Sequence, residues 1–139
     1  MHNMAEVLHK GYQIYVYLAL GRLFSALDLS PDQPHLEGFL DEAIRRDSSR
    51  VSKEAIMHLI RSNSTMTQKV LNALAEKGLA SVVSEPRGYD IRITRGGVAH
   101  FLRFRLLYNE IYQKELRQHF RFIGLPSWLE HSPNAEARK

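Results

Sequence analysis

Residues 51–94 read VSKEAIMHLIRSNSTMTQKVLNALAEKGLASVVSEPRGYDIRIT, and this stretch decides the fold. Ser52 is a good N-cap for a short helix, because its hydroxyl can accept a hydrogen bond from an unpaired amide of the first turn. Ser64 can cap a second helix in the same way. The segment Lys77-Gly78-Leu79 predicts a Schellman motif at the end of that second helix, since glycine readily adopts the left-handed conformation.

Two strand-like runs follow the second helix. They cover residues 80–83 and 89–93 and flank Pro86-Arg87-Gly88, which is a turn sequence. Helix, helix, hairpin is the order of a winged helix-turn-helix, in which one helix enters the DNA major groove. The sequence therefore predicts a mainly α fold with a small β-hairpin wing.

The second helix divides into an apolar face and a polar face at about 100° per residue. The polar face carries no acid before Glu76, near the end of the helix. Hydroxyls, amides and a lysine suit base edges and phosphates, so we expect this face to read DNA. The alternative is an ordinary solvated face of an amphipathic helix. The expected reading residues are Ser64, Thr65, Gln68, Lys69 and Asn72.

A second set of residues is predicted to contact the DNA backbone or the neighbouring groove. Arg87 stands at the tip of the expected hairpin, where a guanidinium suits the negative potential of a narrow minor groove. A solvated loop arginine is the alternative interpretation of this residue. The set consists of Arg87, Tyr89, Arg92, Lys53, Arg61 and Asn63.

The positive charge is concentrated in this part of the chain. The net charge of the whole sequence is +4, but residues 45–105 contain twelve Lys or Arg against five Asp or Glu. Residues 1–44 are net acidic and the remainder is close to neutral. Such a concentration favours a polyanionic partner, whereas a solvated basic surface is the plainer alternative.

Several classes of function find no support in the sequence. Without cysteine, the chain has no disulfide framework and no thiolate metal site. Its seven histidines lack metal-binding spacing and no nucleophile motif is present, so we expect no metal, no cofactor and no enzymatic activity. No secretory signal is evident, and the longest apolar run is shorter than the roughly 20 residues that cross a membrane. We expect a cytoplasmic protein.

The flanking helices predict a homodimer. The helix expected over residues 4–27 is apolar on several faces, which favours burial against a second chain, although wrapping by its own domain is the alternative. A single long helix is expected from residue 95, capped by Thr94, to residue 123. The chain reads as one domain, 1–139, with dimerisation helices 1–29 and 95–125, a DNA-binding core 35–94 and a flexible tail 130–139.

The order of these elements resembles the MarR-type bacterial transcriptional regulators. The residues that carry the resemblance are NALAEKGL, at 72–79, and ITRGG, at 93–97. The expected wing is short, and residues 85–90 differ from the usual tip of that family. PadR-like and other winged-helix regulators are alternatives. So is a winged-helix module for protein interaction, which would carry an apolar or acidic face on its second helix.

The resemblance implies a homodimeric repressor on a pseudo-palindromic operator. Thr65, Gln68 and Lys69 would read or flank bases, and Arg87 would enter the minor groove. In this family, small phenolic or lipophilic effectors often sit between the dimer helices and the DNA-binding part. The aromatic residues Tyr12, Tyr15, Tyr17 and Phe24 could line such a pocket, and they serve equally well as core.

Overall fold

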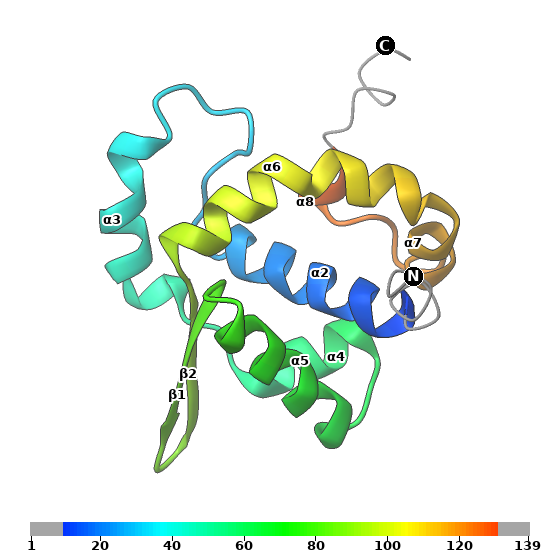
Figure 1. Ribbon diagram of the computed structural model, residues 1–139, viewed down its shortest axis with the longest axis horizontal. Coiled ribbons are helices and arrows are strands. Elements are labelled where there is room, and N and C mark those ends of the chain that lie inside the picture. Colours follow the sequence, from blue (N-terminus) through cyan, green and yellow to red (C-terminus); the bar gives the residue numbers. More distant parts are fainter. Residues whose placement is uncertain (1–9, 131–139) are drawn as a thin grey trace.

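The computed structural model describes residues 10–130, apart from the side chains of residues 10–12, 127 and 130. It is mainly helical with a small antiparallel hairpin, as the sequence predicts. Helix α2 lies at the centre, and α4, α5, α6 and the hairpin pack around it (Figure 1). In chain order the elements are α2 (Lys10–Ser25), α3 (Glu37–Arg45), a 3-10 turn (Asp47–Ser49), α4 (Lys53–Ile60), α5 (Ser64–Glu76), β1 (Ala80–Glu85), β2 (Gly88–Ile93), α6 (Arg95–Ile111), α7 (Gln113–His119) and α8 (Ser127–Glu130).

Helix α2 is buried on most of its circumference by its own chain. Leu18, Leu20 and Leu23 are at most 1% exposed, and Val16 and Tyr17 are nearly as deeply buried. Four elements pack against this helix, so each of its apolar faces has a neighbour within the protomer. Much of its apolar surface is therefore buried within the protomer, and its role in a dimer stays a prediction. The expected residues 4–9 of this helix lie outside the described part.

Two of the three predicted N-caps are confirmed, and the third lies one residue earlier than predicted. Ser52 Oγ accepts from the amide of Ala55 at 3.0 Å, and Thr94 caps α6 by accepting from Gly97. The cap of α5 is Asn63, not Ser64: its Oδ1 accepts from the amide of Met66 at 2.8 Å. Asn63 has the extended backbone that an N-cap requires, and asparagine caps as well as serine, so the helix begins one residue earlier than predicted.

The end of α5 is the predicted Schellman motif. The amide of Leu79 donates to the carbonyl of Leu74 at 2.9 Å, and the amide of Gly78 donates to Ala75 at 3.0 Å. Gly78 has a φ of +71°, which glycine adopts at little cost. This stop turns the chain directly into β1.

The hairpin pairs in register from Ala80 with Ile93 to Glu85 with Gly88, which leaves a two-residue loop of Pro86 and Arg87. Strand β1 is therefore two residues longer than the sequence predicts. An isolated bridge joins the amide of Val51 to the carbonyl of Ile91 at 2.9 Å, just before α4. This bridge fixes the start of α4 against the hairpin.

The predicted long C-terminal helix is wrong, because it is interrupted. Helix α6 ends at Ile111, Tyr112 has a φ of −104° and a ψ of 20°, and α7 follows in a new direction. The turn lets Leu116 and Phe120 enter the core. It also brings His119 Nε2 to 2.7 Å from the carbonyl of Leu59 near the end of α4. Tertiary packing thus bends a segment whose sequence reads as one helix.

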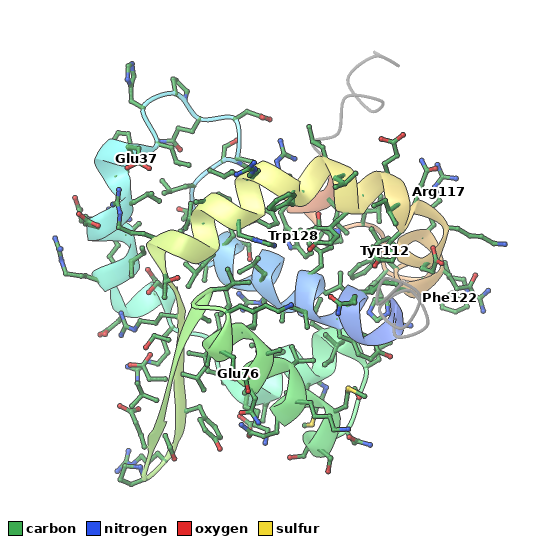
Figure 2. All side chains as sticks on the ribbon, in the orientation of Figure 1. Glu37, Glu76, Tyr112, Arg117, Phe122 and Trp128 are labelled. Carbon is green, nitrogen blue, oxygen red and sulfur yellow. The ribbon has the colours of Figure 1, made fainter. Side chains whose placement is uncertain are left out.

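Trp128 docks back on the centre of the molecule. Its ring makes edge contacts with Tyr17 and Phe101, at centroid distances of 5.8 and 6.0 Å. Figure 2 shows it between α2 and α6. A Cβ at Gly21 would lie 2.3 Å from this ring, so α2 requires glycine where the indole approaches. The predicted tail begins at residue 130, and residues 131–139 lie outside the described part.

Candidate nucleic-acid interface

Helices α4 and α5 are joined by a tight turn of three residues, Arg61 to Asn63. Arg61 adopts the left-handed conformation, with φ 53° and ψ 49°, and its amide bonds back to the last turn of α4. Its side chain is exposed. The turn therefore presents a guanidinium immediately before the N-terminus of α5.

The polar face of α5 is turned to solvent. Ser64, Thr65, Lys69 and Asn72 are exposed and Gln68 is half-buried, so the five predicted reading residues share an accessible surface. The opposite face carries fully buried Val70, Leu71 and Leu74. This division confirms the predicted apolar and polar faces of the helix. A ligand could reach α5 only at its polar face.

One polar residue of α5 belongs to the core instead. Thr67 is fully buried, and its hydroxyl donates to the carbonyl of Asn63 at 2.8 Å. A threonine in a helix can satisfy its hydroxyl on the preceding turn in this way. The burial of Thr67 could have been predicted, because Thr67 lies three residues before Val70 and so shares the apolar face of the helix.

Four of the predicted site residues form one contact chain. Lys53 Nζ donates to Gln68 Oε1 at 3.1 Å, and Gln68 Nε2 donates to Asn72 Oδ1 at 3.0 Å. Lys53 also lies over the ring of Tyr89, 5.6 Å from its centroid. The start of α4, the middle of α5 and strand β2 thus meet at Gln68. Lys53, predicted as a phosphate contact, is directed to this amide.

The hairpin loop carries the other accessible basic residue of the set. Arg87 is exposed between the two strands. At the base of the loop, Glu85 lies 3.5 Å from Arg50, which is also near Asp47. Figure 1 shows that the hairpin and the N-terminal end of α5 project toward the same edge of the molecule. One extended ligand could therefore meet both.

Arg92 is placed differently from the prediction. Its Nη1 lies 3.0 Å from the carbonyl oxygens of Ile44 and Arg46 and 3.2 Å from that of Arg45, and its Nε donates to Asp90 at 2.9 Å. These carbonyls belong to the end of α3, where no intrahelical donors remain. The guanidinium thus caps the end of α3 from the hairpin.

A second arginine holds α3 at its other side. Arg95, the first residue of α6, donates to Asp41 at 2.8 Å and also pairs with Glu37. The hydrogen bond that Arg95 donates to Asp41 is the main cause that raises the pKa of Arg95. Figure 2 shows Glu37 at the N-terminal end of α3. Helix α3 is therefore fixed by arginines that precede and follow the hairpin's last residue.

The aromatic residues proposed for an effector pocket are mostly core. Phe24 is 1% exposed and stacks on Phe101 at 4.8 Å. The hydroxyl oxygen of Tyr17 lies 2.5 Å from Asn109 Oδ1 and 3.2 Å from the carbonyl oxygen of Arg105, and burial raises the pKa of Tyr17 above its ordinary value. Tyr15 is half-buried, and the side chain of Tyr12 lies outside the described part. The side chains of Tyr17 and Phe24 are therefore part of the hydrophobic core.

An open cavity of about 420 Å³ lies at the C-terminal end of α2. Its floor is aromatic and its rim is polar, formed by the loop that leads toward α3. The lining residues are Phe24, Ser25, Asp28, Leu29, Ser30, Pro31, Gln33 and Trp128. Phe24 alone among the predicted effector residues reaches this cavity, so its lining differs from the expected pocket.

Within residues 10–130, no group of three or more His, Asp or Glu side chains could hold a metal ion. In that range, no helix has both the length and the apolar character needed to cross a bilayer.

The residues brought together are thus an exposed polar helix face, a lysine–amide chain beside it and a basic hairpin loop. This arrangement offers hydrogen-bond donors and positive charge on one side of the molecule. Comparison with protein-family models, curated proteins and solved structures finds no match to this chain.

Proposed function

We propose that α4 and α5 form a helix-turn-helix, that the hairpin is its wing, and that the protein is a dimeric, sequence-specific regulator of transcription that binds double-stranded DNA. The observation that carries the proposal is the exposed face of α5. Its residues Ser64, Thr65, Lys69 and Asn72 are accessible, and the only acid in the helix is Glu76 in the last turn. A helix that enters a major groove needs such a face.

The neighbouring elements support the same function. Arg61 precedes α5 and Arg87 stands on the hairpin loop, so positive charge flanks the polar face at both ends. In a winged-helix complex these positions meet phosphates or the minor groove, while the helix between them meets bases. A protein-interaction module would need an apolar or acidic face on α5, and the exposed residues there are neither.

The resemblance to MarR-type regulators extends the proposal to a repressor on a pseudo-palindromic operator. Response to a small effector is a further prediction from that resemblance. The cavity at the end of α2 is open to solvent and is lined in part by Phe24, whereas Tyr17 is buried in the core and does not line it. Any effector site built on the predicted aromatics would therefore have to differ from the one expected.

The proposal is tested by titrating the protein with random-sequence duplex DNA at increasing salt. With roughly 6–10 phosphate contacts per dimer, we expect the affinity to fall on the order of 10³-fold or more between about 50 and 200 mM salt. Fluorescence anisotropy of a labelled duplex gives the slope directly. An affinity that does not change with salt, or no binding at low salt, would refute the DNA-binding function.

A further inference from the structure

The side-chain hydrogen bonds that link Lys53, Gln68 and Asn72 have a fixed donor-to-acceptor direction. An ammonium group carries donors only, so the atom of Gln68 that lies 3.1 Å from Lys53 Nζ must be its oxygen. The nitrogen of the same amide then faces Asn72, which must accept with Oδ1. A single lysine thus sets the orientation of two amides in succession, one helical turn apart on α5.

This orientation decides which atoms remain for a ligand. Gln68 Oε1 accepts from Lys53, and Asn72 Oδ1 accepts from Gln68, so one of the two lone pairs of each amide oxygen is already used. Asn72 keeps both N–H groups of its amide, and Gln68 keeps a second N–H on the nitrogen that it directs to Asn72. Both side chains lie on the polar face of α5, and Asn72 is exposed. The centre of that face is therefore richer in available donors than in available acceptors.

The position of Lys53 supports a role beyond stability. It is the first residue of α4, where the helix dipole places partial positive charge and disfavours a cation. The ring of Tyr89 and the oxygen of Gln68 hold it there despite that repulsion. Removing the ammonium would relieve the dipole repulsion and, at the same time, free both amides to rotate.

We propose that Lys53 is a positioning residue that gives the reading face of α5 its donor character, and that this face selects guanine. In the major groove, guanine offers two acceptors, O6 and N7, whereas adenine offers one acceptor and one donor, cytosine offers a donor, and thymine offers one acceptor beside its methyl group. A donor-rich amide pair is matched best by guanine, which alone offers two acceptors. This inference rests on the proposed DNA-binding function and specifies the sequence preference of the same site.

The test is selection from a random-sequence duplex library, followed by sequencing of the bound fraction. Wild-type protein should enrich sites with guanine at the central contacted positions. Lys53→Met keeps the apolar stem but removes the donors, so the preference for guanine over adenine there should fall by about tenfold. Lys53→Arg, which keeps a donor-only cation, should retain the preference. Lys114→Met on α7 removes the same charge elsewhere and should leave the selected sequences unchanged.

A second variant reverses the direction of the hydrogen bond between residues 68 and 72. In Gln68→Glu, both carboxylate oxygens are acceptors, so Asn72 must turn its nitrogen inward and offer Oδ1 to the groove. The selected base should then change from guanine to cytosine or adenine, which carry donors at this edge. Thermal melting of each variant shows whether the fold is intact.

The outcomes separate the two proposals. A wild-type protein that binds no duplex at low salt refutes the DNA-binding function itself. Selective binding whose guanine preference is the same in Lys53→Met as in the wild type, or a wild-type preference for adenine or cytosine at these positions, overturns the role of Lys53 and leaves DNA binding intact. Loss of the preference in Lys53→Met with its retention in Lys53→Arg supports the inference.

Discussion

Arg61 occupies a backbone conformation that suits glycine better than arginine. Its φ of 53° and ψ of 49° place it in the left-handed region at the end of α4. A non-glycine residue pays about 1–2 kcal/mol there, and many helices end on glycine for this reason. The side chain is exposed and makes no hydrogen bond or ion pair within the described residues. In the proposed function, this exposed guanidinium is available to a DNA phosphate.

Arg61→Gly should therefore separate stability from binding. Relief of the backbone strain, less the extra flexibility of glycine in the unfolded chain, should raise the free energy of unfolding by about 0.5–1 kcal/mol. The lost charge should weaken binding to random duplex DNA and lower the salt slope by about one. Denaturant unfolding and salt titration measure the two effects. Arg61→Lys is the control, because it keeps both the charge and the strain. A destabilised Arg61→Gly protein would contradict this account of the turn.

At the level of elements, Arg92 joins the hairpin to α3. Its guanidinium meets three carbonyl oxygens at the end of that helix, from residues that precede it by more than 45 positions. Arg92→Met keeps most of the side chain's volume but leaves these carbonyls without their donor. We expect the free energy of unfolding to fall by about 2–3 kcal/mol, while the salt slope of DNA binding stays unchanged.

Chemical denaturation and the same salt titration check this expectation for Arg92. Arg103→Met is a matched control, because Arg103 is an exposed arginine on α6 and should affect stability little. If Arg92 contacts a phosphate instead, its replacement will lower the salt slope by about one and leave the stability near that of the wild type.

The elements that depend on neighbouring residues could be predicted from the sequence. The cap at Ser52, the stop at Gly78 and the hairpin loop at Arg87 follow from short-range chemistry, and the structure confirms them. The predicted cap at Ser64 is wrong by one residue, because the neighbouring Asn63 caps a helix equally well. The roles of Arg92 and Lys53 could not be predicted in this way, since the carbonyls of α3 and the amide of Gln68 are distant in sequence.

Two features of the helices depend on the whole fold. The apolarity of α2 predicts burial on many sides, and within the protomer α4, α5, α6 and β2 pack against it. The role of this helix in a dimer stays a prediction. Residues 95–123 keep a helical pattern without proline, so the interruption at Tyr112 leaves no local signal. Packing of His119 against the end of α4 favours the bend, and such packing is a property of the whole fold.

For the whole molecule, we expect the dimer contact in the second of the two segments predicted to dimerise, residues 95–125. Large apolar side chains remain exposed on the second half of α6 and directly after α7: Leu107, Ile111, Phe122 and Ile123 are 51%, 57%, 77% and 72% exposed. Figure 2 shows Phe122 and Arg117 at the end of the molecule formed by α7, away from the hairpin. Soluble monomers rarely leave large apolar patches uncovered.

The position of this surface also suits a two-fold dimer on DNA. It lies at one end of the molecule, whereas the hairpin and the N-terminus of α5 face one side (Figure 1). A two-fold axis at that end, directed toward the same side, would present both α5 helices to one duplex, as a pseudo-palindromic site requires. Contact through the outer surface of α3 would not use the exposed apolar residues after α7.

We therefore expect Ile111→Glu and Phe122→Glu to convert a dimer into a folded monomer. Both side chains are largely exposed within the protomer, so the substitutions should change its own stability by no more than about 0.5 kcal/mol, whereas a charge buried between two copies opposes their association. Phe39→Glu is the control, because Phe39 is 47% exposed on α3 and lies outside the proposed contact. Sedimentation equilibrium at micromolar concentration distinguishes the states. A wild-type protein that sediments as a monomer would refute the dimer, and a Phe122→Glu protein that remains dimeric would place the contact elsewhere.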